Sequence, residues 1–342
     1  MKTTPASLGY RMPAEWEEHE ATWLSWPKNP ETFPPSILGD VERAYSRVVG
    51  ALSEGEEVRV LVDDDRMEKR ARSMVKGGPN VSFIRLKTAD VWVRDYAPTC
   101  VRGKDVALVK WTFDAWGGKY DDLKPDDGAG KELARLSGLR IFDPGMVLEG
   151  GSIDVNGRGT VLTTEQCLLN PNRNPGLRKR ALEYRLRVNL GVKHVVWLGS
   201  GILGDDTDGH VDDIARFVAP DVVALAWEGS TSDPNHAPLE DNLRRLRNSL
   251  DQDGEIFDIV TVPMPPPVVT PHGRLPASHL NFYIGNAAVL VPTFGSPTDG
   301  NAIGTLGPYF PGRRVVGIDC RALVYGLGTL HCVTQQVPAL GG

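Results

Sequence analysis

The chain has 342 residues, of which 41% are hydrophobic and 24% charged, an ordinary composition for a globular protein with a sizeable core. Its formal net charge of -6 argues against general nucleic-acid binding, which requires a basic surface, and suits an enzyme that attracts a cationic small molecule. The N-terminal residues lack the apolar segment of a secretion signal, and no run of about 18 apolar residues is present. We therefore expect a cytoplasmic protein without a membrane partner.

The secondary-structure signal is mixed, because short β-rich runs alternate with helical patterns. Strands are expected at 57–62, 106–111, 193–198, 222–227 and 287–292. Helices are expected at 41–52, with Asp40 as a candidate cap, at 176–190 and at 239–250. The Pro-rich stretch 263–271 is expected to be an ordered loop rather than a hinge, so the chain has no clear domain linker.

Polar landmarks recur along the chain at a spacing of roughly sixty residues, which suggests a repeat architecture. In a radial repeat, the loops of successive units converge on one axis, so residues far apart in the sequence can form one site. The landmarks are Asp95, Glu149, His210, Asn281 and Cys332.

The first cluster with chemical potential is VWVRDYAP, at 91–98. A strand-like Val-Trp-Val run ends in Arg94 and Asp95. A carboxylate at a strand end beside an aromatic wall could hold a planar cation through paired hydrogen bonds and stacking. A surface Arg–Asp pair is the alternative, and this motif alone does not decide between them.

The second cluster is LEGGSID, at 148–154. Gly150 and Gly151 permit positive φ or a close approach of the backbone to a ligand, which would place Glu149 in a pocket. Taken by itself, the motif favours a plain turn.

The third cluster, GDDTDGHVDD at 204–213, holds five aspartates within nine residues. So many carboxylates are costly unless they are solvated, bind cations or meet a positive substrate. His210 and Asp212 would share one face of an extended segment, which suits proton transfer beside a bound cation. The EF-hand pattern fails at Gly204, although a His/Asp metal site stays open as an alternative.

The preceding GSGILG, at 199–204, fits a dinucleotide-binding pattern but leads into Asp-Asp-Thr-Asp-Gly. That sequence starts a helix poorly and would repel a pyrophosphate, so we reject dinucleotide binding.

The fourth cluster is GLGTLHCVTQQ, at 326–336. Cys332 follows a Gly-rich segment and precedes polar residues, which is unlike a core cysteine and suits a nucleophilic thiolate. His331 would point away from Cys332 in an extended segment, so we interpret it as structural. The other three cysteines are expected to be buried free thiols, namely Cys100, Cys167 and Cys320.

Together and in this order, the motifs resemble the agmatine deiminase and bacterial-type peptidylarginine deiminase family of guanidino-group-modifying enzymes. The resemblance also covers MPAEWEEHEATWLSWP, EGGSIDVNGRGTVLTTEQCLLNPNRNP, HLNFYIGNAAVLVPTFG and HCVTQQVP, and so runs over nearly the whole chain. It implies a five-bladed α/β propeller of the pentein type, with pseudo-fivefold symmetry and ββαβ repeats, that forms one catalytic domain over 1–342.

The resemblance also implies roles for individual residues. The nucleophile falls on Cys332, the general acid and base on His210, the guanidinium-binding carboxylates on Asp95 and Asp212, and the supporting glutamate on Glu149. Trp92 matches a tryptophan of the pocket, and Asp206 is added as a substrate-binding residue.

The implied reaction hydrolyses agmatine to N-carbamoylputrescine and ammonia through a covalent thiouronium on cysteine, with no cofactor or metal. Arginine, peptidyl-arginine or another guanidine are alternative substrates, and amidino transfer to an amine is an alternative reaction. A guanidine-binding module without turnover is the non-enzymatic alternative. A homo-oligomer is compatible with the sequence.

The chain departs from the family pattern at three places. It has GLGTLHC before and at Cys332 where Gly-Gly-Gly-Asn-Ile-His-Cys is frequent, and WVRDYAP where Trp-Ala-Arg-Asp-Thr-Gly-Pro is frequent. Asp208 replaces a common asparagine. These changes lie where the shape of the substrate is read.

Overall fold

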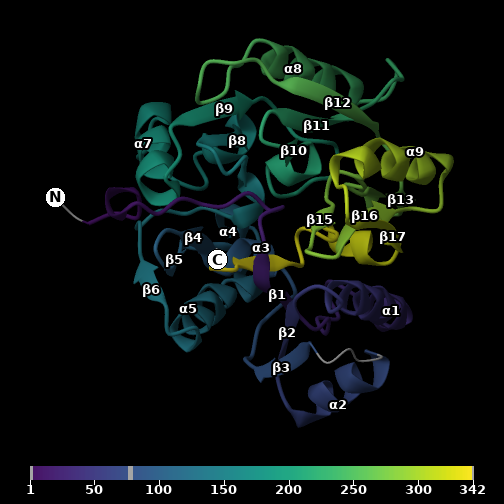
Figure 1. Ribbon diagram of the computed structural model, residues 1–342. Helices are drawn as coiled ribbons and strands as arrows, with labels where there is room; N and C mark the ends of the chain where they lie inside the picture. The colour runs from purple at the N-terminus through teal and green to yellow at the C-terminus, as the bar shows by residue number, and fades with distance from the viewer. Residues whose placement is uncertain (1–2, 76–79, 341–342) are drawn as a thin grey trace.

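The computed structural model describes residues 3–75 and 80–340. In these parts of the chain, a unit of three strands recurs five times, with the same pairing each time. The first strand of a unit runs antiparallel to the second, and the third runs parallel to the second after a helical crossover. Figure 1 shows the units following one another around the molecule.

Four units are continuous in sequence. Their strands are β4 (Thr99–Arg102), β5 (Val106–Val109) and β6 (Arg140–Phe142); β7 (Asp154–Val155), β8 (Thr160–Thr164) and β9 (His194–Leu198); β10 (Ala215–Ala219), β11 (Val222–Trp227) and β12 (Asp258–Pro263); and β15 (Tyr283–Ile284), β16 (Ala288–Thr293) and β17 (Arg314–Asp319).

The fifth unit joins the two ends of the chain. β1 (His19–Ser25) pairs in parallel with β2 (Glu57–Val62) and antiparallel with β18 (Gln335–Pro338), so that Trp23 lies opposite Gln335. An additional strand, β3 (Val81–Arg85), extends this sheet on the other side of β2. The C-terminal strand therefore completes the unit that the N-terminal strand begins.

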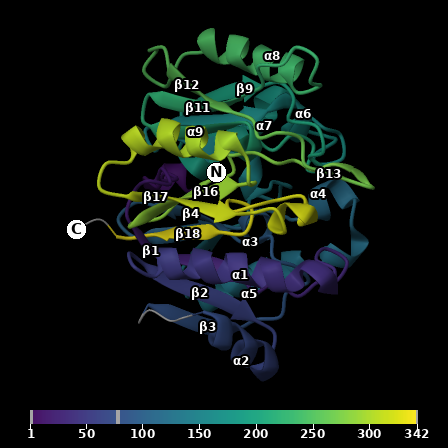
Figure 2. The ribbon, with the colours of Figure 1, turned by 90° about the vertical axis from the view of Figure 1, so that its right-hand side faces the viewer.

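The longer helices lie on the outside of the strands, as Figures 1 and 2 show for α1, α5, α7, α8 and α9. The helices are α1 (Pro35–Leu52), α2 (Asp65–Met74), α3 (Val93–Tyr96), α4 (Ala115–Gly118), α5 (Asp126–Leu136), α6 (Glu165–Leu168), α7 (Lys179–Leu190), α8 (His236–Arg247) and α9 (Pro297–Leu306). Short 3-10 turns are η1 (Ala6–Leu8), η2 (Asp121–Leu123), η3 (Gly150–Ser152), η4 (Val211–Asp213), η5 (Gly307–Tyr309) and η6 (Leu323–Gly326).

Helix α1 illustrates how the sequence forms the outer layer. Its buried residues include Val41, Tyr45, Val48 and Leu52, spaced to form one apolar face against the sheet. The predicted start at 41 with Asp40 as cap is wrong. The helix begins at Pro35, because proline at the first helical position needs no hydrogen-bond partner for its nitrogen, and Asp40 lies inside the helix.

The other predicted elements are present with small shifts at their ends. β2 and β11 have the predicted bounds, whereas β5 ends two residues early, β9 begins one residue late and β16 is shifted by one residue. α7 begins three residues later than predicted, and α8 lies three residues earlier. Stretch 263–271 is an ordered connection, as predicted, and ends in a hairpin of β13 (Val269–Thr270) with β14 (Gly273–Arg274).

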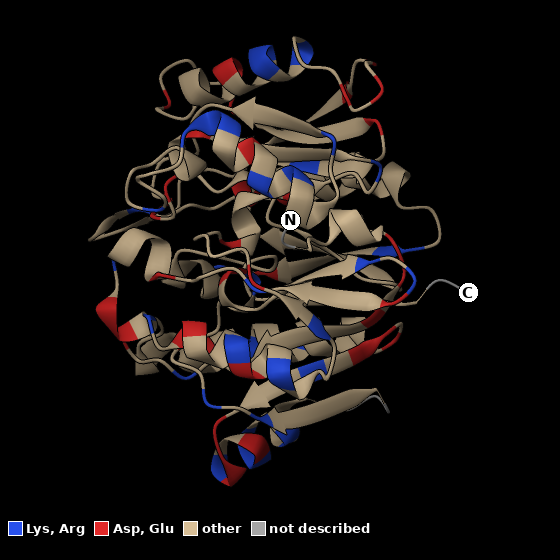
Figure 3. Cartoon of the chain, turned by 90° about the vertical axis from the view of Figure 1, so that its left-hand side faces the viewer, with Lys and Arg blue, Asp and Glu red and all other residues tan. Residues whose placement is uncertain are grey.

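Acidic and basic residues are interspersed along the outer helices in the view of Figure 3. Within 3–75 and 80–340, none of the helices combines the length and the apolar character that crossing a membrane requires.

The five predicted landmarks occupy equivalent places in the fold. Each lies in the segment just before the first strand of a unit: Asp95 before β4, Glu149 before β7, His210 before β10, Asn281 before β15 and Cys332 before β18. Their regular spacing in the sequence therefore reflects the repeat, and the first strands bring these segments together in space.

Candidate active site

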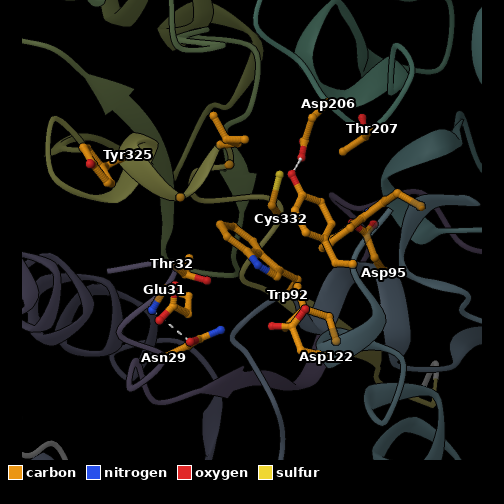
Figure 4. Close-up of a pocket in the computed structure, with 16 residues that line it drawn as sticks. Asn29, Glu31, Thr32, Trp92, Asp95, Asp122, Asp206, Thr207, Tyr325 and Cys332 are labelled. Carbon is orange, nitrogen blue, oxygen red and sulfur yellow. Dashed lines mark hydrogen bonds between the residues drawn. The ribbon is translucent and has the colours of Figure 1, made fainter. Parts of the chain in front are cut away.

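A cavity of about 160 Å³ lies where these segments meet. Four of the predicted site residues line it, namely Trp92, Asp95, Asp206 and Cys332 (Figure 4). The other three predicted residues, Glu149, His210 and Asp212, are buried. His210 lies near Asp95, Asp212 lies near Cys332, and Glu149 lies behind His210.

Asp95 lies in the short helix α3, so the predicted strand end is wrong. Its carboxylate accepts hydrogen bonds from Trp116 Nε1 at 2.9 Å and from the backbone N–H of Gly151 at 3.0 Å. Arg94 points away from Asp95, is buried, and bonds to Glu15 at 3.3 Å, so the alternative of a surface Arg–Asp pair is also wrong. Burial raises the pKa of Asp95 to about 6, with contributions from neighbouring carboxylates, although His210 opposes the shift.

Three of the predicted site residues pack their side chains against Gly151. A Cβ atom there would lie 2.6 Å from His210 Nδ1, 2.9 Å from Asp212 Oδ2 and 3.1 Å from Asp95 Oδ1. Only glycine permits these three side chains to pack so closely against the backbone. The Gly-Gly motif thus serves the close approach that the sequence suggested, although the partners are side chains of the site itself.

His210 immediately precedes the 3-10 turn η4, and Asp212 lies within it, so the predicted extended segment is wrong. The turn still brings both side chains to Gly151. The loop before it is held by Asp205, whose carboxylate accepts from the backbone N–H groups of Thr207 at 2.7 Å, Gly209 at 2.8 Å and His210 at 3.1 Å.

The His210 imidazole lies between two carboxylates. Its Nδ1 is 3.9 Å from Asp95 Oδ1, and its Nε2 is 3.9 Å from Glu149 Oε2. Burial alone would lower the pKa of His210, but the charge of Asp95 and the contacts with Cys167 and Glu149 outweigh it and hold the pKa well above the usual value. These neighbours therefore favour the protonated imidazole.

Glu149 is held by a buried ion pair. Arg173 Nε donates to Glu149 Oε1 at 2.7 Å, and the same guanidinium donates to Thr207 O at 2.8 Å and to Asp208. Burial raises the pKa of Glu149, but His210 and Arg173 together bring it below the usual value. Arg173 thus connects Glu149 to the acidic loop, where Asp208 supplies a carboxylate for it.

Asp212 is oriented by His331. His331 Nδ1 lies 2.7 Å from Asp212 Oδ2, and its Nε2 lies 2.9 Å from Glu15 Oε2. Because 330–333 form a turn and not an extended segment, His331 faces the site, contrary to the prediction. Burial raises the pKa of Asp212, and the hydrogen bond and charge of His331 more than offset this, so Asp212 is ionised.

The Cys332 thiol is buried beside Asp212, with Sγ 3.9 Å from Asp212 Oδ2. Burial and the charges of Asp212, Asp213 and Asp95 raise its pKa well above the usual value. Trp92 and Cys332 both pack against Gly328, where a Cβ would be 2.5 Å from the tryptophan ring and 3.2 Å from Sγ.

The remaining cysteines are buried free thiols, as predicted. Cys167 nevertheless lies close to the site. One ligand atom each of Glu149, Cys167 and His210 lie within 4.8 Å of one another, which makes them the residues that could hold a metal ion in the described part of the chain.

The outer part of the cavity is acidic. Asp206 accepts a hydrogen bond from the Tyr120 hydroxyl, and Glu31 and Asp122 also line the cavity. No lysine or arginine is among the described residues that line it. Burial raises the pKa of Asp206, the deepest of these three carboxylates.

Trp116 is a site residue that the sequence did not reveal. It lines the cavity, bonds to Asp95, and has positive φ of 54°, next to Ala115 with φ of 60°. Left-handed conformations at such residues cost about 1–3 kcal/mol each and are typical of functional sites. The only signal for it was the Gly117-Gly118 pair that follows.

Comparisons with known proteins show the family to which the chain belongs. The model of the Porphyromonas-type peptidyl-arginine deiminase family matches residues 11–338. The agmatine deiminase of Stutzerimonas stutzeri is 36% identical over 99% of this chain and 98% of its own length.

Two solved structures are also similar. The agmatine deiminase of Enterococcus faecalis superposes with a TM-score of 0.92 at 33% identity, covering 99% of this chain and 98% of that one. A cysteine-to-serine variant of the C. jejuni agmatine deiminase with substrate bound superposes with a TM-score of 0.86 at 30% identity, covering 96% of each chain.

An α/β fold of this kind, with a thiol, an imidazole and carboxylates around one cavity, defines the class of the protein as hydrolases of carbon–nitrogen bonds in guanidino groups. Within that class, the chain belongs to the Porphyromonas-type peptidyl-arginine deiminase family.

Proposed function

We propose that the chain is an agmatine deiminase, which hydrolyses the guanidinium of agmatine to N-carbamoylputrescine and ammonia. The observation that carries this proposal is the convergence of His210, Asp95 and Asp212 around Gly151, with Cys332 Sγ next to Asp212 and an acidic cavity beside them. The relatives named above as agmatine deiminases support the choice of reaction.

Asp95 and Asp212 bind the guanidinium in this proposal. Paired charge-assisted hydrogen bonds between carboxylates and a planar cation fix its orientation as well as its position. Among the described residues, Asp212 Oδ1 and Glu149 Oε2 are buried carboxylate oxygens that have no hydrogen-bond partner. A bound guanidinium offers the N–H donors that such oxygens need.

The charge of the substrate ionises the nucleophile. In the free protein, three aspartates and burial keep the Cys332 thiol protonated, because the pKa is well above the usual value. A guanidinium placed beside the sulfur neutralises the carboxylates and stabilises the thiolate. The thiol proton is released to solvent as the substrate binds, so thiolate formation is coupled to the presence of a cationic substrate.

His210 transfers the protons. Cys332 Sγ attacks the central guanidinium carbon, and the imidazolium protonates the nitrogen that leaves as ammonia, which gives a thiouronium on sulfur. The neutral imidazole then takes a proton from water as the water oxygen adds to the same carbon. Collapse of this adduct expels the thiolate and releases the second proton of the added water, which leaves the ureido product. That proton converts the ammonia to ammonium, so one water is consumed and the positive charge of the guanidinium leaves on ammonium.

The acidic outer cavity favours an amine at the far end of the substrate. Agmatine carries a second positive charge there, whereas free arginine carries a carboxylate as well. The cavity carboxylates attract the amine of agmatine and repel the carboxylate of arginine; they belong to Asp206, Glu31 and Asp122. The described lining residues include no lysine or arginine that could bind a carboxylate. Trp92 forms an apolar wall beside Cys332 for the carbon chain.

We further propose that the five units are the blades of a pentein-type α/β propeller and that 1–342 form one catalytic domain. The common pairing order of the units and the return of β18 to β1 support both points.

The test is parallel incubation of the purified protein with agmatine, arginine and a blocked arginine peptide, with assays for ammonia and ureido product. Cys332→Ala is the matched control. Turnover of agmatine alone is expected. Turnover of arginine or the peptide alone would show that agmatine is not the substrate. No turnover of any of the three compounds would overturn the proposal.

A further inference from the structure

Asn281 is the one landmark of the repeat that the proposed mechanism leaves without a role. The other four equivalent segments supply Asp95, Glu149, the His210 and Asp212 pair, and Cys332. The fifth segment, before β15, supplies Asn281, which is fully buried. We propose that Asn281 positions the Cys332 sulfur and stabilises its thiolate through an N–H donor, an inference that rests on the proposed role of Cys332 as nucleophile.

The orientation of the Asn281 amide follows from its oxygen. Asn281 Oδ1 accepts hydrogen bonds from Thr329 Oγ1 at 2.9 Å, from the His331 backbone N–H at 3.0 Å and from the Cys332 backbone N–H at 3.4 Å. An atom that receives these donors is the carbonyl oxygen and not the nitrogen. The amide nitrogen therefore faces Cys332 Sγ, at 3.2 Å.

Asn281 therefore contacts both the backbone around Cys332 and its sulfur atom. The oxygen accepts from the backbone of 331 and 332 and, at 3.4 Å, can accept from the Cys332 thiol; the nitrogen lies 3.2 Å from the same sulfur and is the atom that can donate to a thiolate. The backbone carbonyl of Asn281 also accepts from the His331 N–H at 3.0 Å. One residue of the neighbouring unit thus sets the place of Sγ relative to Asp212.

An amide is the side chain that suits this position electrostatically. Asp212, 3.9 Å from the sulfur, and the more general influence of Asp213 and Asp95 all oppose its ionisation. A lysine or arginine beside it would stabilise a thiolate but would repel the guanidinium substrate, and another carboxylate would raise the thiol pKa further. A neutral N–H donor stabilises the thiolate without either effect.

The experiment measures the pH dependence of Cys332 alkylation by iodoacetamide without substrate, together with kcat and KM for agmatine. In Asn281→Ala, we expect a rise of about one unit in the thiol pKa and a loss of about ten- to a hundredfold in kcat, as for removal of a hydrogen bond to a charged group. KM should change less than about threefold, because Asn281 does not line the cavity.

Asn281→Asp is the second variant, because it keeps the shape and the accepting oxygen and replaces only the donor. It should raise the thiol pKa above the wild-type value, and above that of a folded Asn281→Ala variant, so the test remains available if the alanine variant fails to fold. Asn156→Ala is the matched control. Asn156 is buried, its Oδ1 accepts from the backbone N–H groups of residues 158, 159 and 160 at 3.0–3.1 Å, and it lies in the turn between β7 and β8.

The control should leave both the thiol pKa and kcat unchanged. Folded Asn281 variants with the wild-type thiol pKa and wild-type kcat would overturn the proposed role, as would an equal effect in Asn156→Ala. The alkylation measurement needs no turnover, so it reports on Asn281 even where a failure to hydrolyse agmatine overturns the proposed function alone.

Discussion

Substitution of Asp212 by asparagine should make Cys332 more reactive towards alkylating agents while it makes the enzyme less active. Asp212 is ionised, and its Oδ2 lies 3.9 Å from Cys332 Sγ. In the free protein this charge opposes formation of the thiolate. Asparagine has nearly the same shape, keeps an oxygen that can accept from His331, and carries no charge.

The size of the effect follows from Coulomb's law. Two unit charges at about 4 Å interact by about 4 kcal/mol at an effective dielectric constant of about 20, which corresponds to about 3 pKa units. His331 bonds to the same carboxylate oxygen and takes part of its charge, so we expect the thiol pKa to fall by about 1–2 units. Turnover should fall because the guanidinium loses one of its two charged partners.

The assay is the rate of iodoacetamide labelling as a function of pH without substrate, with peptide mass spectrometry to assign the label to Cys332. Asp233→Asn is a matched control. Asp233 forms an ion pair of 2.7 Å with Arg274, and neither residue lines the cavity. A folded Asp212→Asn variant whose thiol pKa is unchanged or higher would refute the electrostatic account of the free thiol.

Three further predictions concern the walls of the cavity. With the pKa of Asp95 at about 6, the carboxyl is neutral below that pH and binds the cation poorly, so kcat/KM should decline as the pH falls through about 6 in a steady-state pH profile. Gly328→Ala places a Cβ 2.5 Å from the Trp92 ring and 3.2 Å from Cys332 Sγ, so these side chains must shift. The substitution should lower kcat/KM about a hundredfold in steady-state assays, with an unchanged melting temperature excluding misfolding; full activity would contradict the tight fit. Asp206→Asn should raise KM for agmatine about five- to twentyfold, and an unchanged KM would remove Asp206 from substrate binding.

The repeat and its landmarks could be predicted from the sequence because they depend on local patterns. β-branched runs such as those of β2 and β11 fit a buried strand and little else, and their bounds were correct. The spacing of polar landmarks was visible because each unit places its polar segment at the same point, before its first strand.

Details that depend on tertiary contacts were not predictable in this way. Val91-Trp92-Val93 has the composition of a strand, yet Val93 begins a helical turn whose residues Arg94 and Asp95 meet partners from distant segments. His331 faces the site because the chain turns at 330–333, and alternation of side chains in an extended segment predicted the opposite. Trp116 reaches Asp95 only through a left-handed backbone that local propensity disfavours.

The central claim is that Cys332 carries the substrate covalently during hydrolysis of agmatine. The most direct measurement is rapid acid quenching of the enzyme during turnover, followed by mass spectrometry of the intact protein and of its peptides. The account predicts an adduct with the mass of agmatine less ammonia on the peptide that contains Cys332, and neither adduct nor turnover in Cys332→Ala. Agmatine turnover by Cys332→Ala at the wild-type rate would contradict it.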